Sequence, residues 1–281
     1  MMRSILAAVL AASLLGVAPQ LASAVDDHAP QPPRQKWSFS GPFGTFDRAQ
    51  IQRGFKVYRE VCAVCHGLDL VAFRTLGQPG ALGYSEAQVK QIASEYKIKD
   101  GPNDQGEMFE REGRPADRFP RPWANENAAR AQYNAVPPDL SVMAKARTYE
   151  RGFPWFIFDI FTQYQENGPY YLVALMTGYE DKPPAGVTLP AALSYNKYFP
   201  GHAIAMPKPM EDGRVTYEDG SPQTLLQYSK DVTAFLMWTA EPHMEARKRI
   251  GLQVMIFLLV FAGLLYFAKQ KVWYDVKHGR I

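Results

Sequence analysis

Cysteine and histidine are scarce in this sequence. Only two cysteines, Cys62 and Cys65, occur among the 281 residues, together with five histidines. A closed structural zinc site needs four ligands, but there is no second cysteine pair, and the other histidines show no paired spacing: His28, His202, His243 and His278. A disulfide framework is excluded if both thiols have another use. The sequence also contains no internal repeat.

The two cysteines belong to a Cys-x-x-Cys-His motif that ends at His66. Two thiols one helical turn apart can each form a thioether with a haem vinyl group, and the following histidine can bind the iron as an axial ligand. A thioredoxin-like dithiol would need a βαβ context, which the flanking sequence does not supply. The motif therefore predicts one covalently bound haem c.

The N-terminal residues 1–24 have the layout of a secretory signal peptide. Arg3 precedes an apolar run from Ile5 to Val17, and Ala22-Ser23-Ala24 follows as a small-residue cleavage site. An uncleaved anchor helix is the alternative, but the run is too short to span a bilayer comfortably. We expect the mature chain to begin at Val25, with residues 25–246 forming an exported, periplasmic c-type haem domain.

Near the C-terminus, Ile250 to Ala268 is a run of 19 residues without a charge. A helix of this length covers about 28 Å, close to the ~30 Å of the bilayer hydrocarbon. We expect residues 247–270 to be a transmembrane helix with its flanks and 271–281 a cytoplasmic tail. The protein should therefore lie in a bacterial inner membrane as a single-pass protein, with its haem domain in the periplasm.

Helical periodicity predicts a mainly α-helical haem domain with long irregular loops. Asp47 and Gln50 resemble a capping box at the start of a helix that leads to Cys62. The other expected helices run from Glu86 to Tyr96 behind Ser85, from Pro137-Pro138-Asp139 to Arg147, and from Ser221-Pro222 to Pro242. Residues 100–122 and 180–222 are expected to be loops.

Two segments have unusual compositions. Acidic residues dominate 100–112 and predict either a solvated surface or a docking face for a basic partner. Aromatic and aliphatic residues crowd positions 153–164, a stretch too short to cross a membrane, which we interpret as core or local packing rather than as a contact with another subunit.

The second axial ligand of the iron decides the chemistry of the site. An open iron would admit oxygen or peroxide, whereas a methionine closes it and raises the reduction potential. Met143, Met176 and Met237 fall on apolar helix faces and suit the core. Prolines bracket Met206 in a constrained loop, so it is the first candidate, with Met210 and, as a bis-histidine alternative, His202 remaining open.

Several segments, in the same order, resemble the cytochrome c1 family of the cytochrome bc1 complex. They are Arg53–Tyr58 before the haem motif, Asp100–Asn103, Gly106–Phe109, Pro137–Ser141, Thr177–Tyr179, Asn196–Met206 and Ala240–Pro242. The resemblance extends from about Asp47 into the tail. It departs from some members, which carry an additional disulfide, and from short mitochondrial forms in the long interval between Arg147 and Tyr171.

The resemblance implies specific roles for individual residues. Cys62 and Cys65 would hold the haem, His66 and Met206 would ligate the iron, and Arg147 would pair with a propionate. Three further residues would lie near the haem: Tyr58, Pro138 and Tyr171. No catalytic residue is implied, because a closed iron changes redox state without binding a substrate.

The resemblance also implies partners and a function. The chain would pass single electrons from a Rieske iron–sulfur protein to a soluble or membrane cytochrome c, beside cytochrome b, in a dimeric quinol–cytochrome c reductase. That complex would serve respiratory or photosynthetic electron transport and translocate protons, with no role for nucleic acid. The alternative is the haem c subunit of another membrane dehydrogenase or a terminal oxidase; an open-iron peroxidase and a purely structural tether are the more distant rivals.

Overall fold

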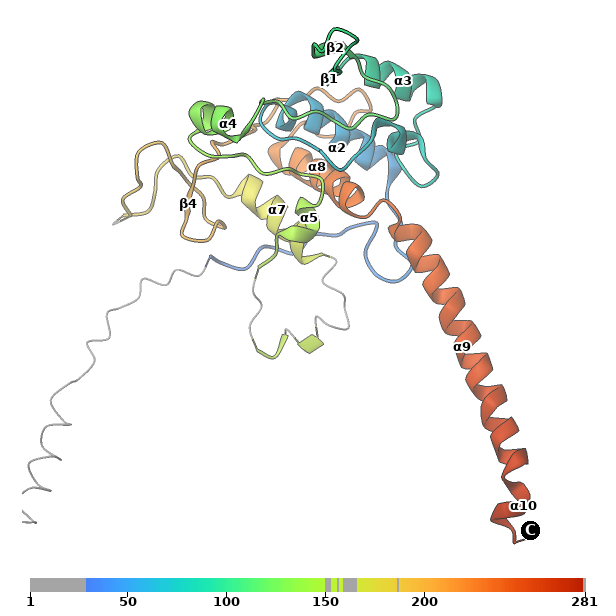
Figure 1. Ribbon diagram of the computed structural model, residues 1–281. Helices are drawn as coiled ribbons and strands as arrows, with labels where there is room; N and C mark the ends of the chain where they lie inside the picture. The colour runs from blue at the N-terminus through green and yellow to red at the C-terminus, as the bar shows by residue number, and fades with distance from the viewer. Residues whose placement is uncertain (1–28, 150–152, 156, 159–165, 186, 280–281) are drawn as a thin grey trace, which may run out of the picture.

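The computed structural model describes residues 29–149, 153–155, 157–158, 166–185 and 187–279. It shows a mainly helical head from which one long helix, α9, projects as a separate rod (Figure 1). The expected fold class, a helical haem domain with irregular loops and one C-terminal membrane helix, is confirmed. The expected signal peptide, residues 1–24, lies outside the described residues.

The elements are numbered as in Figure 1. The α-helices are α2 (Arg48–Glu60), α3 (Glu86–Ser94), α4 (Glu126–Tyr133), α5 (Met143–Ala146), α7 (Asn167–Thr177), α8 (Leu225–Ala240), α9 (Met244–Val272) and α10 (Tyr274–Lys277). Short 3₁₀ turns cover Cys62–Val64 and Phe73–Gly77. Two antiparallel hairpins pair β1 (Lys97–Asp100) with β2 (Phe109–Glu112) and β3 (Ser194–Tyr195) with β4 (Ala203–Ile204).

Helix α2, which leads to the haem motif, packs directly against α8. Gly54 makes this possible, because a Cβ there would lie 2.0 Å from the carbonyl oxygen of Asp231 on α8. Next to this crossing, the Phe235 ring of α8 lies 5.4 Å from the ring of Phe55 and 5.8 Å from that of Tyr58. The contact buries the aromatic face of α2 and fixes the position of its C-terminal end.

A buried ion pair sits at the same crossing. Asp231 has no exposed side-chain surface, and its carboxylate accepts hydrogen bonds from Arg53 Nε at 2.9 Å, Gln227 Nε2 at 2.8 Å and Gln50 Nε2 at 3.2 Å. Asp47 does cap α2 by accepting from the Gln50 backbone N–H. The expected capping box is nevertheless incomplete, because the Gln50 side chain is turned to Asp231 rather than back to residue 47.

Other helix boundaries also differ from the expectations. The Ser85–Gln88 capping box is confirmed, but α3 ends at Ser94, two residues early. Helix α8 begins at Leu225 behind Thr224, whose hydroxyl accepts from the Gln227 N–H, not at Ser221-Pro222. Helix α5 is four residues long and begins only at Met143, because the Pro-Pro-Asp segment before it is extended.

The stretch 100–122 is not entirely loop, as expected from its composition, since its first part completes the β1–β2 hairpin. Arg111 on β2 forms ion pairs with Asp100 and Asp117. Residues 180–222 contain only the two-residue strands β3 and β4 among those described, so the expectation of irregular structure there is largely confirmed.

The described part of the aromatic segment is exposed. Phe153 is 80% exposed and Phe158 55% exposed, and Trp155 and Ile157 are also on the surface. The interpretation of these four residues as core was wrong; the remaining positions between 159 and 164 lie outside the described residues.

Helix α9 is long and apolar enough to cross a membrane, and it leaves the head after a break at Glu241-Pro242. Its first turns are hydrogen-bonded to residues 39–46, in the segment that precedes α2. Lys248 Nζ donates to the carbonyl oxygens of Phe39 and Gly44 at 2.6 and 3.1 Å, and Glu245 accepts from the Phe46 N–H at 2.8 Å. The head and the helix are thus joined by polar contacts as well as by the chain itself.

Candidate haem-binding site

The Cys-x-x-Cys-His motif follows immediately after α2. The chain tightens into a 3₁₀ turn at Cys62, whose carbonyl oxygen accepts hydrogen bonds from the backbone N–H of Cys65 at 3.1 Å and of His66 at 2.9 Å. Both cysteines are half-buried and neither forms a disulfide. Burial raises the pKa of the Cys62 thiol to about 12, the opposite of the shift that a reactive redox dithiol requires.

Three side chains from outside the motif hold its backbone. Trp123 Nε1 donates to the Cys65 carbonyl at 3.2 Å, the Tyr133 hydroxyl donates to the Val64 carbonyl at 3.1 Å, and the buried Tyr58 hydroxyl donates to the His66 carbonyl at 3.1 Å. Tyr58 was expected near this site. Trp123 and Tyr133 were missed, because nothing in their local sequence marks them.

The His66 ring is oriented by one contact. Its Nδ1 lies 2.7 Å from the carbonyl oxygen of Pro138, an acceptor, so Nδ1 carries the proton and Nε2 keeps its lone pair. Burial lowers the pKa of His66, and the hydrogen bond to Pro138 and the nearby charge of Asp139 offset this only in part, so the ring is neutral near pH 7. A neutral, oriented imidazole is the form that binds haem iron.

Asp139 locks the Pro138 segment over the motif. Its carboxylate accepts hydrogen bonds from the Asp69 N–H at 2.7 Å and the Ser141 N–H at 2.9 Å, while the Leu140 N–H donates to the Gly67 carbonyl at 3.0 Å. These contacts fix the Pro138 carbonyl relative to His66. The Pro-Pro-Asp run does not start a helix as expected, and nothing in its local sequence marks its role in orienting His66.

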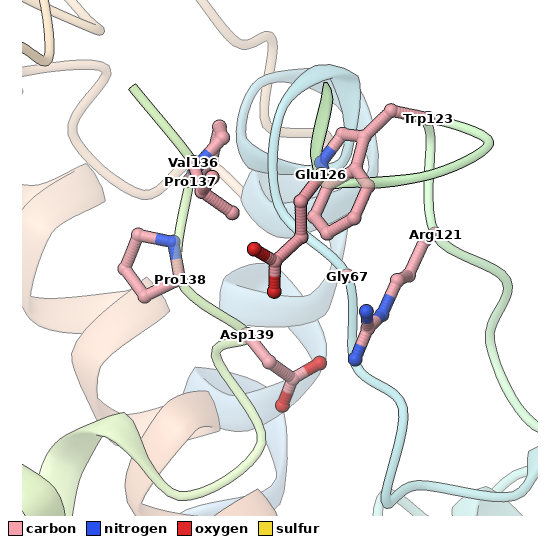
Figure 2. Close-up of a pocket in the computed structure, with 8 residues that line it drawn as sticks. All are labelled: Gly67, Arg121, Trp123, Glu126, Val136, Pro137, Pro138 and Asp139. Atoms are coloured by element: carbon pink, nitrogen blue, oxygen red, sulfur yellow. The ribbon is translucent and has the colours of Figure 1, made fainter. Parts of the chain in front are cut away.

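A small cavity of about 200 Å³ lies beside the motif. Figure 2 shows the carboxylates of Glu126 and Asp139 and the guanidinium of Arg121 directed toward a common space that Trp123 and Pro138 also line. The volume is below the ~300 Å³ at which small-molecule pockets begin. It is a small recess beside the haem motif, lined by both polar and apolar residues.

The methionines fall into distinct environments. Met143, Met176 and Met237 are buried, as expected of core residues. Met210 is only 2% exposed within the hydrophobic core, and Met108 is 64% exposed on the β1–β2 hairpin. Met206 is half-buried, and its carbonyl oxygen accepts a hydrogen bond from the Tyr179 hydroxyl at 3.0 Å. Among these three loop methionines, Met206 is therefore the one whose backbone is hydrogen-bonded and whose side chain is not packed in the hydrophobic core.

His202, the alternative ligand, is engaged locally. Its ring stacks on Tyr195 with centroids 5.6 Å apart, and its Nδ1 lies 3.3 Å from the Asn196 carbonyl oxygen. It also sits at a φ of +56°, in the turn that joins β3 and β4. These contacts give His202 a structural role that needs no iron.

Arg147, Tyr171 and Tyr179 lie near one another. Burial raises the pKa of Tyr171, and the positive charge of Arg147 offsets part of this rise. The pKa of Tyr179 is likewise raised, mainly by burial and in part by Tyr171. Arg147 is exposed and forms no ion pair within the described part of the chain. Its guanidinium is available for an anion, and through Tyr179 this group extends to Met206.

The residues of the motif fit haem better than the other groups considered. Within the described ranges, no three His, Cys, Asp or Glu side chains are grouped so as to hold a metal ion on their own. Two unpaired thiols on a short turn, followed by an oriented neutral imidazole, are the donor set of a covalently attached haem.

Comparisons with known proteins agree. The profile of the cytochrome C1 family matches residues 37–276. The chain is 63% identical over 273 residues to cytochrome b/c1 of Bradyrhizobium diazoefficiens. This alignment covers 97% of the present chain and 40% of that longer protein. It is 54% identical to cytochrome c1 of Blastochloris viridis, over 88% of each protein, and 44% identical to cytochrome c1 of Rhodospirillum rubrum, over 87% of this chain and 88% of the relative.

Proposed function

Because the chain belongs to the cytochrome c1 family, we propose that it passes single electrons from a Rieske iron–sulfur protein to a cytochrome c within a quinol–cytochrome c reductase. Members of the family are haem subunits of the cytochrome bc1 complex and carry covalently bound c-type haem. This chain is such a subunit, anchored to the membrane by α9. The reaction of quinol and the coupling to proton translocation are assigned to the complex as a whole.

The observation that carries the proposal is the orientation of His66. With Nδ1 directed at the Pro138 carbonyl oxygen, 2.7 Å away, only Nε2 is left to bind iron. Cys62 and Cys65 would form the two thioethers, which would hold the haem on the turn that ends α2 and so fix its position relative to His66. The haem supplies the one-electron redox couple; the protein supplies its position, potential and docking surfaces.

Met206 is our proposed second axial ligand. Met210 is committed to the core and Met108 is on the surface of the hairpin, whereas Met206 is half-buried and its backbone is held by Tyr179. A thioether opposite an imidazole closes the iron to oxygen and raises the reduction potential. A closed iron suits a relay and not an oxygenase.

The remaining predicted residues would surround the haem. Arg147, which has no ion partner among the described residues, would bind a propionate with its paired N–H donors. Tyr171 and the Pro138 segment would line the pocket, and Tyr58 would act through the His66 backbone, to which its hydroxyl is bonded.

The membrane arrangement is also a proposal. Residues 1–24 would be removed as a signal peptide, residues 25–246 would lie in the periplasm, 247–270 would cross the inner membrane and 271–281 would remain in the cytoplasm. Cytochrome b and the Rieske protein would be the neighbours, in a dimeric complex.

The acidic hairpin is the proposed docking site for a basic cytochrome c. Arg111 pairs with Asp100, and Lys99 lies opposite Glu110 in the strand register, but Asp104 and Glu107 form no ion pair within the described residues. These two carboxylates in the turn of the hairpin would raise the encounter rate of a positively charged acceptor.

Replacement of Met206 tests the assignment. In the purified complex, Met206→Leu should leave the haem attached but lower its midpoint potential by on the order of 0.2 V, a quarter of the ~0.8 V range that axial ligation covers. Reduction of cytochrome c should slow accordingly. Met210→Leu is the matched control and should leave the potential unchanged. Equal potentials for the two variants would remove Met206 from the iron.

A further inference from the structure

Phe43 is an exposed aromatic residue between two buried ones in the segment that precedes α2. Phe39 and Phe46 on either side of it are 0% and 4% exposed, whereas Phe43 is 75% exposed. It lies in the turn between Gly41 and Gly44, which is closed by a hydrogen bond from the Gly44 N–H to the Gly41 carbonyl. The turn presents the Phe43 ring to whatever surrounds the head.

This turn is attached to the beginning of α9. Lys248 on α9 donates to the carbonyl oxygen of Gly44, the residue next to Phe43, at 3.1 Å and to that of Phe39 at 2.6 Å. Glu245 on α9 accepts from the Phe46 N–H and pairs with Arg48 at 2.7 Å. The position of Phe43 relative to the membrane helix is therefore fixed by contacts on both sides of the turn.

The level of the turn relative to the bilayer follows from the sequence of α9. The uncharged run begins at Ile250, two residues after Lys248, which corresponds to about 3 Å along a helix. Each headgroup layer is roughly 6 Å thick, half the difference between the full bilayer and its hydrocarbon core. Lys248 thus enters the headgroup layer, and the turn bonded to its ammonium group lies at the border of that layer.

A second exposed apolar segment lies on the same side of the head. Residues 153–155 and 157–158, between α5 and α7 in the sequence, lie outside the head on the side toward which α9 leaves it (Figure 1). The exposed fractions of their large apolar side chains are 80% for Phe153, 50% for Trp155, 41% for Ile157 and 55% for Phe158. Tryptophan and tyrosine are enriched at the membrane–water interface because they combine an apolar ring with a polar group, and phenylalanine and leucine supply the apolar contacts of interfacial segments.

We propose that Phe43 and the exposed side chains of Phe153, Trp155, Ile157 and Phe158 insert into the headgroup layer of the bilayer that α9 spans. The head then rests on the membrane at three places, namely α9, the Phe43 turn and the aromatic loop. Three contacts fix the tilt of the head, and with it the distance of the haem site from the membrane surface, which a single helix could not do. The inference rests on the proposed membrane anchoring by α9 but not on the identity of the electron donor or acceptor.

Spin labelling in the intact complex tests this directly. Because both native cysteines would be bound to haem, an introduced cysteine is the only free thiol of this chain. Phe43→Cys and Phe158→Cys would each carry a nitroxide in the complex reconstituted in phospholipid vesicles, and Pro42→Cys replaces Phe43→Cys if that variant does not assemble. Labelled wild-type complex gives the background from other subunits.

The readout is the collision rate of the label with oxygen, which concentrates in lipid, relative to a water-soluble nickel chelate. We expect this ratio at positions 43 and 158 to exceed, several-fold, that of Lys90→Cys on the exposed side of α3. A ratio equal to that of Lys90→Cys would show an aqueous surface, and a label protected from both reagents would show a protein partner; either result overturns the inference. Val260→Cys in α9 reports separately on the anchor, so its failure is distinguishable from failure at 43 and 158.

Discussion

Asp231 provides the sharpest test of how the haem motif is held. Its carboxylate is fully buried at the α2–α8 crossing and accepts hydrogen bonds from Arg53, Gln50 and Gln227. Asp231→Asn keeps the volume but removes the charge, and it leaves the Arg53 guanidinium, 17% exposed, without its buried partner. Breaking one side of such a pair costs about 3–5 kcal/mol. The remaining contact of Arg53 with Asp219 favours the lower end, about 3 kcal/mol.

The matched control is the second carboxylate on the same guanidinium. Asp219 is 43% exposed, so Asp219→Asn should cost only about 0.2–1 kcal/mol. Thermal unfolding of the full-length haem protein in detergent, followed by far-ultraviolet circular dichroism, should show a decrease in Tm of about 6–12 °C for Asp231→Asn, given 2–4 °C per kcal/mol for a domain of this size. Equal shifts for the two variants would refute a strong buried pair at this crossing.

Three further predictions concern docking, packing and pH. Asp104→Lys combined with Glu107→Lys should raise the KM for a basic cytochrome c about tenfold at low ionic strength and little at high salt. Glu180→Lys, away from the hairpin, should not. A KM of the double variant equal to that of wild type at low ionic strength would make the acidic run a solvated surface. Gly54→Ala should destabilise the head by about 1–3 kcal/mol, measured by thermal unfolding, because its Cβ would meet a backbone carbonyl at 2.0 Å; an unchanged Tm would mean that the helices separate freely. Burial alone would raise the pKa of Glu241, but hydrogen bonds from Lys145 and Arg247 lower it below its usual 4.5. Wild type should therefore exceed Glu241→Gln in stability by about 1–2 kcal/mol above that pH and lose the advantage as the pH falls below it. A constant difference in stability from pH 7 to pH 3 would contradict this linkage.

The features that were predicted correctly are those set by neighbouring residues. The Ser85–Gln88 capping box spans four positions and formed as expected. The uncharged run before Ala268 lies within one continuous helix. The covalent haem followed from three residues within five positions. In each case the interacting residues are close together in the sequence, so the feature can be recognised from the sequence alone.

The wrong predictions concern residues whose partners are distant. Gln50 faces Asp231, 181 residues away, and that contact prevents the second half of its expected capping box. The β1–β2 hairpin was missed because charged residues dominate both strands and no apolar alternation marks them. Helix α8 starts at Leu225 and not at the expected Ser221-Pro222. The Asp212 carboxylate accepts a hydrogen bond from the Leu225 N–H at 2.6 Å, which favours Thr224 as the N-cap.

The site shows the same division. His66 could be assigned from the motif, but the acceptor that orients its ring belongs to Pro138, 72 residues later. Pro138 entered the prediction only through the family resemblance, and Trp123 and Tyr133 did not enter it at all. A local sequence motif identifies the residues that would bind the haem. The residues that orient them are brought close only by the tertiary fold, so the motif does not reveal them.

The most direct test of a closed histidine–methionine iron is the near-infrared spectrum of the oxidised protein. Sulfur-to-iron coordination gives a weak charge-transfer absorption there, which we expect in wild type and in Met210→Leu but not in Met206→Leu. The reduced wild type should also fail to bind carbon monoxide rapidly, whereas reduced Met206→Leu should bind it. Persistence of the band in Met206→Leu, or its absence from wild type, would contradict the account.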